Sequence, residues 1–317
     1  MESTLIHENT VLAKRMKSKK LTVLMMAYNQ GQYIDEAIKS VFNQKIEFEW
    51  ELLIGDDCST DNTEEIVKKW IASNPEHIHY FQHKQNIGLH SNYRFLVQKS
   101  QGEFIALLEA DDYWIDPKKT KVQIAFMEKN PNIAWSFTNG DITDQYGNVI
   151  EEVRHNFPNI FNLEYYLSHF FNPLNNTIIF RKSAEPKEYP DFFYGIIQWD
   201  TVLHYLRAMN GEIGFLPLNG MAWRRHVNAN SLSEAFGNEK RYFDWLKINK
   251  GIKRHIPRAL HHYFKVNYIA YEFLSIYNLR KKNYIRFSFF LIKMIFNKPM
   301  RSCQEYRDLF YKLRKSF

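Results

Sequence analysis

Three acidic residues, Glu109, Asp111 and Asp112, directly follow the apolar run Phe104–Leu108. Carboxylates so close together repel one another, which raises their pKa values unless a cation lies among them. Along an extended chain, side chains two residues apart point the same way, so Glu109 and Asp111 can share one ligand. Mg²⁺ and Mn²⁺ take oxygen ligands and are commonly held by one or two carboxylates together with substrate phosphates. The pattern predicts a divalent metal site, and the alternative is an acidic turn in which Asp112 caps the next element.

The apolar run before these acids is typical of a strand buried on both faces of a mostly parallel sheet. Open α/β sheets bind ligands beyond the carboxyl ends of their strands, which is where the acids lie. Strands are predicted at Leu21–Ala27, Glu51–Gly55, His79–Gln82 and Phe104–Leu108. A helical pattern follows each of the first three, and the first of these helices shows an apolar face from Ile34 to Phe42. This alternation predicts βαβ units and an α/β fold.

The remainder of the chain continues with mixed elements. The predicted elements are a helix from Pro117 to Glu128, a strand at Ile133–Thr138, a hairpin at Asp141–Val153, a strand at Asn175–Arg181, a helix at Gln198–Met209, a strand at Gly214–Leu216, a short strand or loop at Ala222–His226 and a helical region from Lys240 to Phe317. We therefore expect a polar leader (residues 1–20), one α/β domain (residues 21–235) and a helical basic C-terminal region (residues 236–317).

Charge is distributed unevenly along the chain. Residues 240–317 hold 19 of the 42 Lys and Arg but 4 of the 35 Asp and Glu, a net charge of +15, which leaves −8 for residues 1–239. Opposite signs suggest a core that holds cations and a tail that seeks an anionic surface. The two cysteines, Cys58 and Cys303, are far apart and fit a reducing cytoplasm. No signal peptide and no apolar stretch of membrane-spanning length is expected.

Four short motifs, each after a predicted strand, together resemble family 2 glycosyltransferases. They are Tyr28-Asn29, IGDDCSTDNT at Ile54–Thr63, NIG at Asn86–Gly88 and ALLEADDYW at Ala106–Trp114. The resemblance covers about residues 20–230. It implies the GT-A fold and transfer of a sugar from a nucleotide-sugar with inversion at the anomeric carbon. Residues 21–115 would bind the nucleotide-sugar, and residues 116–235 would form the acceptor side.

The resemblance assigns roles to the acids at the strand ends. Glu109-Ala110-Asp111 matches the family's Asp-x-Asp motif with Glu in the first place. Asp111 would be the direct metal ligand, Glu109 would contact the ribose or the metal shell, and Asp112 would lie near the donor sugar. Asp56 and Asp57 look like the pair that recognises the base and ribose, although local capping of the next helix is an alternative. The nucleotide-sugar contacts implied in this way are Ala27, Tyr28, Asn29, Asp56, Asp57, Asn86, Gly88, Asn92, Glu109, Ala110, Asp112, Arg224 and Arg225. Many family members carry an Arg-Asn pair where this chain reads Asn92-Tyr93-Arg94, which puts the role of Asn92 in doubt.

An inverting transfer also needs a base for the acceptor hydroxyl. The resemblance points to Asp200 near the start of a helix, with Asp191 in reserve. A carboxylate at a helix N-terminus is also stabilised by the helix dipole without any catalysis. The segment Met221–Ser231 resembles the family's closing segment, in which His226 would complete the metal shell or bind a phosphate. Arg224 or Arg225 would neutralise phosphate charge.

The C-terminal stretch Tyr284–Phe296 combines aromatic and basic residues. It could lie in a membrane interface facing anionic headgroups, or it could pack as a helical hairpin on the catalytic domain. No nucleic-acid-reading module is recognisable, so nucleic acid is not an expected partner.

The sequence as a whole predicts a cytoplasmic enzyme that is peripheral on the inner face of the cytoplasmic membrane. It would be a Mn²⁺- or Mg²⁺-dependent hexosyl- or N-acetylhexosaminyltransferase that uses a UDP-sugar and extends a cell-surface glycan or lipid-linked acceptor. The alternatives are a non-catalytic nucleotide- or glycan-binding domain and a sugar nucleotidyltransferase. The second would carry a Gly-rich, basic loop after the first strand, where this chain has MMAYNQGQY.

Overall fold

The computed structural model describes residues 19–169, 171–226, 238–258 and 260, and the single positions 283, 286, 288 and 293. The chain divides into two compact units. The first comprises Met1–Phe161, Pro173–Glu185 and Asn210–Arg225, and the second Asn162–Asn172, Pro186–Met209 and His226–Phe317. Most of the predicted polar leader, the stretch Tyr284–Phe296 apart from three positions, and much of the basic C-terminal region lie outside the described residues.

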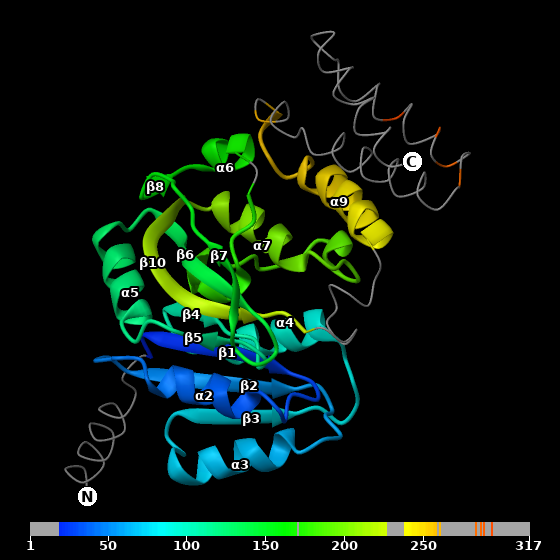
Figure 1. The fold of residues 1–317 in the computed structure, drawn as a ribbon. Coiled ribbons are helices and arrows are strands. Elements are labelled where there is room, and N and C mark those ends of the chain that lie inside the picture. Colours follow the sequence, from blue (N-terminus) through cyan, green and yellow to red (C-terminus); the bar gives the residue numbers. More distant parts are fainter. Residues whose placement is uncertain are drawn as a thin grey trace, which may run out of the picture. The chain divides into compact units, whose positions relative to one another are not determined.

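The first part of unit 1 is a parallel sheet with its helices. The strands pair in the order β3-β2-β1-β4, and along the chain a helix connects each strand to the next one (Figure 1). The bounds are β1 Leu21–Ala27, α2 Ile34–Phe42, β2 Trp50–Asp56, α3 Thr63–Ser73, β3 Ile78–Gln82, α4 Leu89–Lys99 and β4 Phe104–Leu107. These elements confirm the predicted βαβ alternation.

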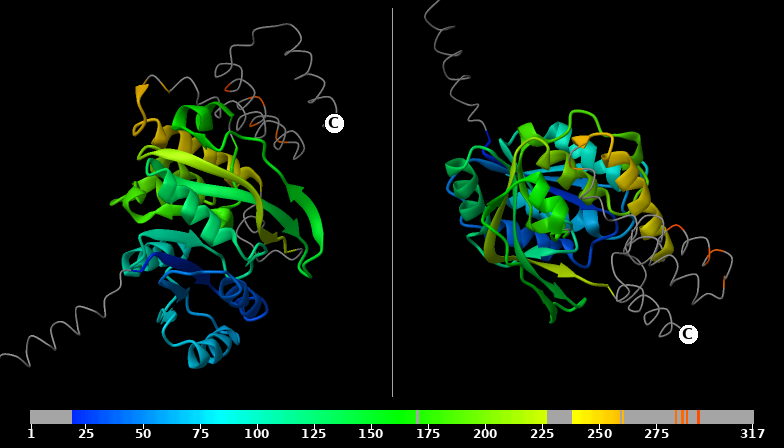
Figure 2. Two further views of the ribbon diagram at one scale, coloured as in Figure 1. Left: turned by 90° about the vertical axis from the view of Figure 1, so that its left-hand side faces the viewer. Right: turned by 90° about the horizontal axis from the view of Figure 1, so that it is seen from above.

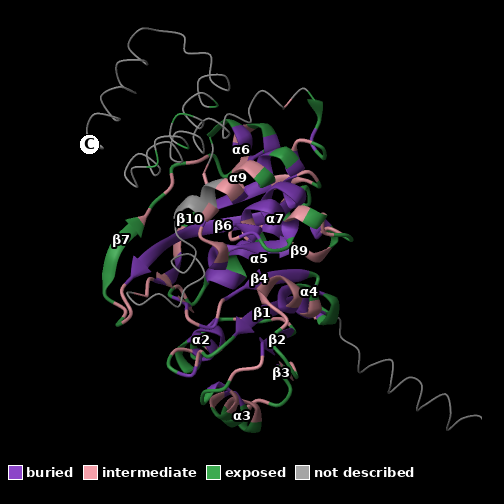
Figure 3. Cartoon of the chain, turned by 90° about the vertical axis from the view of Figure 1, so that its right-hand side faces the viewer, coloured by how far each residue is buried: buried purple, intermediate pink, exposed green. Residues whose placement is uncertain are grey.

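Burial on both faces explains why these strands are apolar throughout. Every residue of β1, β2 and β4 is buried (Figure 3). One face of β1, with Val23 and Met25, packs in a single core with Ile38 and Val41 of α2. Helix α4 contacts β1 and β2, and its Tyr93 is fully buried. Each large apolar side chain so buried stabilises the fold by about 1.5–3 kcal/mol.

The second part of unit 1 extends the sheet with strands of both directions (Figure 2). The bounds are β5 Tyr113–Trp114, α5 Lys119–Lys129, β6 Ile133–Thr143, β7 Val149–Val153, β8 Ile160–Phe161, β9 Ile179–Arg181 and β10 Glu212–Arg224. The sheet continues from β4 as β9-β6-β10-β5, with β7 beside β6 and β8 beside β10. Strands β6 and β10 pair in parallel, whereas β5, β7, β8 and β9 pair antiparallel with their neighbours. The prediction of a mostly parallel sheet therefore holds for the first part, and the whole sheet is mixed.

Three of the predicted stretches differ from what is observed. The stretch Gly214–Leu216 and residues 222–224 of the stretch Ala222–His226 belong to one strand, β10, whose register against β6 shifts on both sides of Asn219. Pro217 lacks an N–H for the ladder, so an irregular pairing at this point is expected. The start of the predicted strand Asn175–Arg181 is a 3₁₀ turn, η1 (Asn175–Thr177). Asparagine favours such turns because its side chain bonds nearby backbone groups.

Unit 2 is helical in its described residues. It contains α6 Leu163–His169, the 3₁₀ turn η3 Asp191–Phe193, α7 Trp199–Ala208 and α9 Asn238–Ile252. Helix α9 holds the loop before α7, because Asp244 Oδ2 accepts the Ile197 N–H at 2.9 Å and Lys240 Nζ donates to Gly195 O at 3.0 Å. No helix in the described parts of the chain has the length and apolar character needed to cross a bilayer.

Candidate functional site

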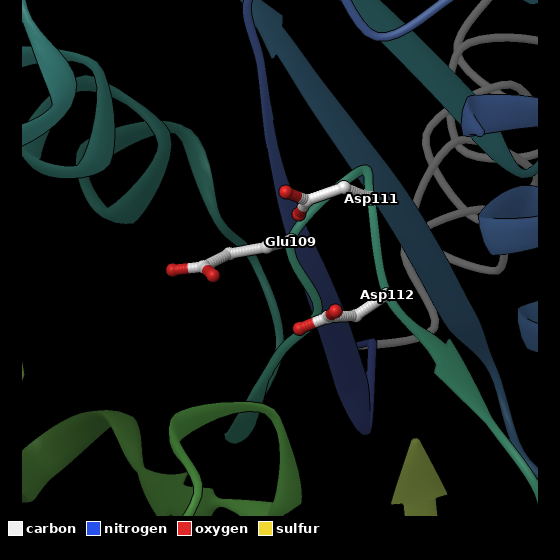
Figure 4. A group of neighbouring side chains, drawn as sticks. All are labelled: Glu109, Asp111 and Asp112. Atoms are coloured by element: carbon white, nitrogen blue, oxygen red, sulfur yellow. The ribbon is translucent and has the colours of Figure 1, made fainter. Parts of the chain in front are cut away.

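The acidic turn after β4 brings three carboxylates together. The chain continues alongside β1, with Leu108 N donating to Leu24 O at 3.0 Å, and then turns so that Asp112 N donates to Glu109 O at 3.1 Å. One oxygen from each of Glu109, Asp111 and Asp112 lies within 4.8 Å of the others. All three side chains project to the same side of the turn (Figure 4). Carboxylate oxygens so grouped fit a hard divalent cation.

Asp112 differs from the other two acids because it is buried and engaged. Its side chain is 1 % exposed, and its oxygens accept bonds from the Arg224 N–H, at 2.7 Å, and from the Asn176 side-chain amide. Burial, followed by the charges of Asp111 and Glu109, raises the pKa of Asp112. Asp112 thus ties the turn to β10 and η1 and makes no cap for α5. Glu109 and Asp111 are half buried and remain the stronger candidates for a metal.

Asn176 supports the turn and was not identified from the sequence. Its side-chain oxygen accepts the Glu109 N–H at 3.1 Å, while its amide nitrogen donates to Asp112. Its backbone oxygen accepts the Trp114 indole N–H at 3.0 Å. The available signal was the pair Asn175-Asn176 ahead of an apolar run, a composition typical of a turn.

The closing segment places its two arginines differently. Arg224 is 4 % exposed, and its terminal nitrogens donate to Asp111 O and to Glu36. Arg225 has a side chain 43 % exposed, with Nη2 3.6 Å from Glu151 Oε2 and the guanidinium 5.5 Å from the Trp223 ring centre. His226, the first residue of unit 2 after β10, is half buried, and its place in a metal shell stays a prediction.

The acids after β2 hold loops together. Asp56 is fully buried and accepts bonds from Ser59, through N–H at 2.9 Å and hydroxyl, and from the Tyr80 hydroxyl. Asp57 accepts the N–H groups of Ile87, at 2.6 Å, and Gly88, at 2.9 Å. Gly88 has a φ of +83°, a backbone conformation that residues other than glycine rarely adopt. These contacts give both acids a structural task, and their recognition of base and ribose stays a prediction.

The other predicted nucleotide contacts fall into exposed and buried groups. Tyr28 is 49 % exposed at the end of β1, and Asn86 is exposed beside Gly88. Asn29 has a φ of 53° and accepts the Thr60 N–H at 2.8 Å through its side chain. Ala27 is buried, and its carbonyl accepts the Asp57 N–H at 2.9 Å.

Asn92 lies inside the fold. It is 1 % exposed, donates to Gly55 O at 2.7 Å and lies 3.1 Å from His83 Nε2. Its contact with a nucleotide stays a prediction that this buried position does not support.

Asp200 lies in the first turn of α7, within unit 2. Its Oδ1 accepts the Thr201 N–H at 2.8 Å, and Asn172 donates to the same carboxylate. Burial raises the pKa of Asp200 despite these bonds, which brings the carboxylate closer to the proton affinity useful in a base. Asp191 is exposed in η3.

Comparison with known proteins identifies relatives of this chain. The family described as Glycosyl transferase family 2 matches residues 22–185, which include the acids after β2 and β4 but neither β10 nor Asp200. An uncharacterized protein of Mycobacterium tuberculosis is 30 % identical over 213 residues, covering 66 % of this chain and 59 % of its own length. A Bacillus subtilis protein named as a teichuronic acid biosynthesis glycosyltransferase, TuaG, is 32 % identical over 135 residues, covering 43 % of this chain and 52 % of that protein. The chain thus spans less than two thirds of the curated relatives it matches.

Solved structures share the fold. TarS of S. aureus (residues 1–349) in complex with UDP-GlcNAc superposes with a TM-score of 0.62 at 19 % identity, over 88 % of this chain and 81 % of that one. The mannosyltransferase PcManGT of Pyrobaculum calidifontis, with GDP-Man and Mn²⁺, gives a TM-score of 0.57 at 12 % identity, over 99 % and 87 % of the two chains. At such identities the likeness establishes a common α/β fold, the GT-A fold.

Proposed function

Because the chain belongs to glycosyl transferase family 2, we propose that it transfers a sugar from a nucleoside-diphosphate donor to a hydroxyl group, with inversion. The observation that carries this proposal is the position of Glu109 and Asp111, half buried at the carboxyl end of β4. Ligands of open α/β sheets bind at this edge. We further propose a hexosyl or N-acetylhexosaminyl group as the sugar and UDP as the nucleotide.

Glu109 and Asp111 would hold Mn²⁺ or Mg²⁺, and the oxygen-only donor set fits either ion. A divalent cation at this position supplies positive charge against the negative charge that gathers on the leaving diphosphate. Arg225, the more exposed of the two arginines, would add a second positive charge for the phosphates. The exposed ring of Tyr28 would stack on the nucleotide base. The loop at Gly88, which Asp57 holds, would lie beside that base.

Asp200 is our proposed base. The acceptor oxygen would bond to the anomeric carbon while the bond from that carbon to the diphosphate oxygen breaks. The proton of the acceptor hydroxyl would pass to the Asp200 carboxylate. Its raised pKa supports this role, and the backbone N–H of Thr201 orients the carboxylate.

We also propose a class of acceptor and binding to the membrane surface. TuaG is named for teichuronic acid biosynthesis, and TarS and PcManGT were solved with UDP-GlcNAc and GDP-Man. These names support a nucleotide-sugar donor and a glycan or lipid-linked acceptor at the cell surface. The net charge of +15 in residues 240–317 supports peripheral binding to anionic lipid on the cytoplasmic side. Truncation after Ser275 should then lower sedimentation with anionic vesicles, and unchanged sedimentation would contradict membrane binding.

The decisive experiment is a donor screen on the full chain. Release of nucleoside diphosphate is measured from UDP-, GDP- and dTDP-sugars with and without Mn²⁺, for wild type, Asp111→Asn and Asp200→Asn. Glu65→Gln, at an exposed position on α3, is the control. Metal-dependent release lost in the first two variants and kept in the control supports the proposal. Nucleotide binding without turnover on any donor would indicate a non-catalytic domain, and pyrophosphate release from a nucleoside triphosphate and a sugar phosphate would indicate a nucleotidyltransferase.

A further inference from the structure

Arg224, the last residue of β10, is a buried cation behind the acidic turn. Its guanidinium lies over two aromatic rings, 4.6 Å from the centre of Tyr33 and 5.1 Å from that of Tyr113. Only 4 % of the residue is exposed. A buried arginine packed against two rings in this way has little freedom to reorient towards a ligand.

Two of the N–H donors of Arg224 bond to the acidic turn, and a third bonds to α2. Its backbone N–H donates to Asp112 Oδ1 at 2.7 Å, and its Nη1 donates to the carbonyl oxygen of Asp111 at 2.6 Å. Its Nη2 donates to Glu36 Oε2, also at 2.6 Å, on the first turn of α2. A single residue therefore connects both the side chain and the main chain of the turn to β10 and α2.

This arrangement has a direct electrostatic consequence. Glu109, Asp111 and Asp112 repel one another, and without a bound cation the turn would gain free energy by separating them. A buried guanidinium offsets part of that repulsion. Its charge-assisted bond to the Asp111 carbonyl fixes the backbone from which the Asp111 carboxylate projects. Both effects favour the grouped arrangement before any ion binds.

We propose that Arg224 is a positioning residue that preorganises Glu109 and Asp111 for a divalent cation, with no direct contact to the diphosphate. The metal-binding part of this inference stands on the geometry alone, and its relevance to catalysis rests on the proposed glycosyltransferase function. The role assigned here replaces the phosphate contact predicted for Arg224 and leaves Arg225 as the arginine for the phosphates.

The same chain contains a matched control. Arg181 lies at the opposite end of β4, where it is opposite Phe104, with its guanidinium 4.9 Å from that ring. It donates to two backbone carbonyls, Ile133 O at 3.0 Å and Met127 O at 2.7 Å, and to Glu103 Oε1 at 3.2 Å. Arg181 thus repeats the ring, carbonyl and carboxylate contacts of Arg224 without any contact to the acidic turn.

The test measures binding of Mn²⁺ alone to the full-length chain, by electron paramagnetic resonance or calorimetry. Loss of an outer partner of a metal ligand typically weakens metal affinity about 10- to 100-fold. We expect a loss of that size in Arg224→Met, a smaller loss in Arg224→Lys and an affinity within about 2-fold of wild type in Arg181→Met. Thermal unfolding of the two Met variants shows whether they are destabilised equally. In turnover, excess Mn²⁺ should restore kcat to Arg224→Met.

Each remaining outcome is informative. Wild-type Mn²⁺ affinity in Arg224→Met, with a raised KM for the nucleotide-sugar, would overturn the proposal and return Arg224 to the diphosphate. Equal loss of Mn²⁺ binding in Arg181→Met would overturn it in favour of a general loss of stability. Absence of Mn²⁺ binding in wild type would overturn this inference together with the metal site. Mn²⁺ binding that depends on Arg224, without sugar transfer, would support this inference and contradict only the proposed function.

Discussion

Two acidic clusters lie at the same edge of the sheet and differ in what holds them. Strands β2 and β4 both pair in parallel with β1, so Asp56-Asp57 after β2 and the acidic turn after β4 face the same way. In the first cluster all four carboxylate oxygens accept hydrogen bonds from the protein, and both residues are buried. In the second cluster only Asp112 is buried.

The comparison indicates that the hydrogen-bond donors around an acidic pair decide whether the pair stabilises the fold or binds a ligand. Where backbone N–H groups and hydroxyls surround a carboxylate, its charge stabilises a loop, as at Asp57 and Gly88. Where an acid remains half exposed beside another acid, as Glu109 and Asp111 do, a cation can reach it from solvent. We expect the first cluster to respond to mutation mainly through stability and the second mainly through activity.

The largest expected effect is the loss of activity in Asp111→Asn. The substitution removes one charge from a half-buried position and keeps the shape of the side chain. If the ion contributes several kcal/mol to the transition state, turnover at saturating donor should fall by about 10³-fold or more. The free energy of unfolding should change by less than about 0.5 kcal/mol.

Donor turnover and urea unfolding of the same preparations check this result, with Glu65→Gln as the control. A variant that loses several kcal/mol of stability in parallel with its activity would place Asp111 with the structural acids and remove the contrast between the clusters.

The second prediction concerns Lys119, the first residue of α5, which lies over the ring of Trp114. The residue is fully buried, its Nζ is 4.6 Å from the Trp114 ring centre, and within the described residues it has no hydrogen-bond partner. Burial lowers the pKa of Lys119 to about 7, and no carboxylate contributes to this shift. Lys119 is therefore not paired with the acids of the second cluster.

The sign of the effect follows from proton binding. Between pH 7 and 10.5 the unfolded chain keeps the Lys119 proton more firmly than the folded chain, so stability rises with pH across this window. The cost of burying the amine is complete below pH 7, where it reaches about 5 kcal/mol as an upper value. Lys119→Met should therefore be more stable than wild type at pH 7, with a gain that shrinks to about 1 kcal/mol at pH 9.5.

Urea unfolding of both proteins at the two pH values measures this difference directly. The Mn²⁺ dependence of turnover should stay unchanged in Lys119→Met. A changed dependence would show that Lys119 compensates the acids after β4, which would make the two clusters alike.

A third, smaller effect is expected in Asp57→Asn. In the variant the remaining side-chain oxygen still accepts one of the two backbone N–H groups, from Ile87 or Gly88. The new side-chain NH₂ faces the other N–H, so that two hydrogen-bond donors point at each other. The cost should be about 1–3 kcal/mol of unfolding free energy. Because the NIG loop loosens, the KM for the nucleotide-sugar should rise while kcat changes little. A fall in kcat with unchanged stability would instead make Asp57 a partner of the reacting groups.

The two clusters also mark how far the sequence could be interpreted. Strands β1, β2 and β4 were predictable because their local apolar runs are buried on both faces. The two-residue strands β5 and β8 were not, since they exist only through pairing with β10, far away in the chain. The acids themselves were visible as a motif. Their supports, the side chain of Asn176 and the backbone N–H of Arg224, could not be recognised from the sequence because they lie 64 and 112 residues away from Asp112.

The smallest effect is expected from removing the hydrogen bond between Tyr80 and Asp56 of the first cluster. Tyr80 donates its hydroxyl to Asp56, and burial raises the pKa of Tyr80, with the bond to Asp56 as the next cause. Tyr80→Phe removes this donor and leaves the bonds from Ser59 in place. We expect a loss of about 1 kcal/mol in unfolding free energy and nearly unchanged turnover, because Asp56 keeps its other donors. If Tyr80→Phe lowers turnover as strongly as Asp111→Asn does, Asp56 acts in the reaction through its charge, and hydrogen-bond supply does not separate structural acids from functional ones.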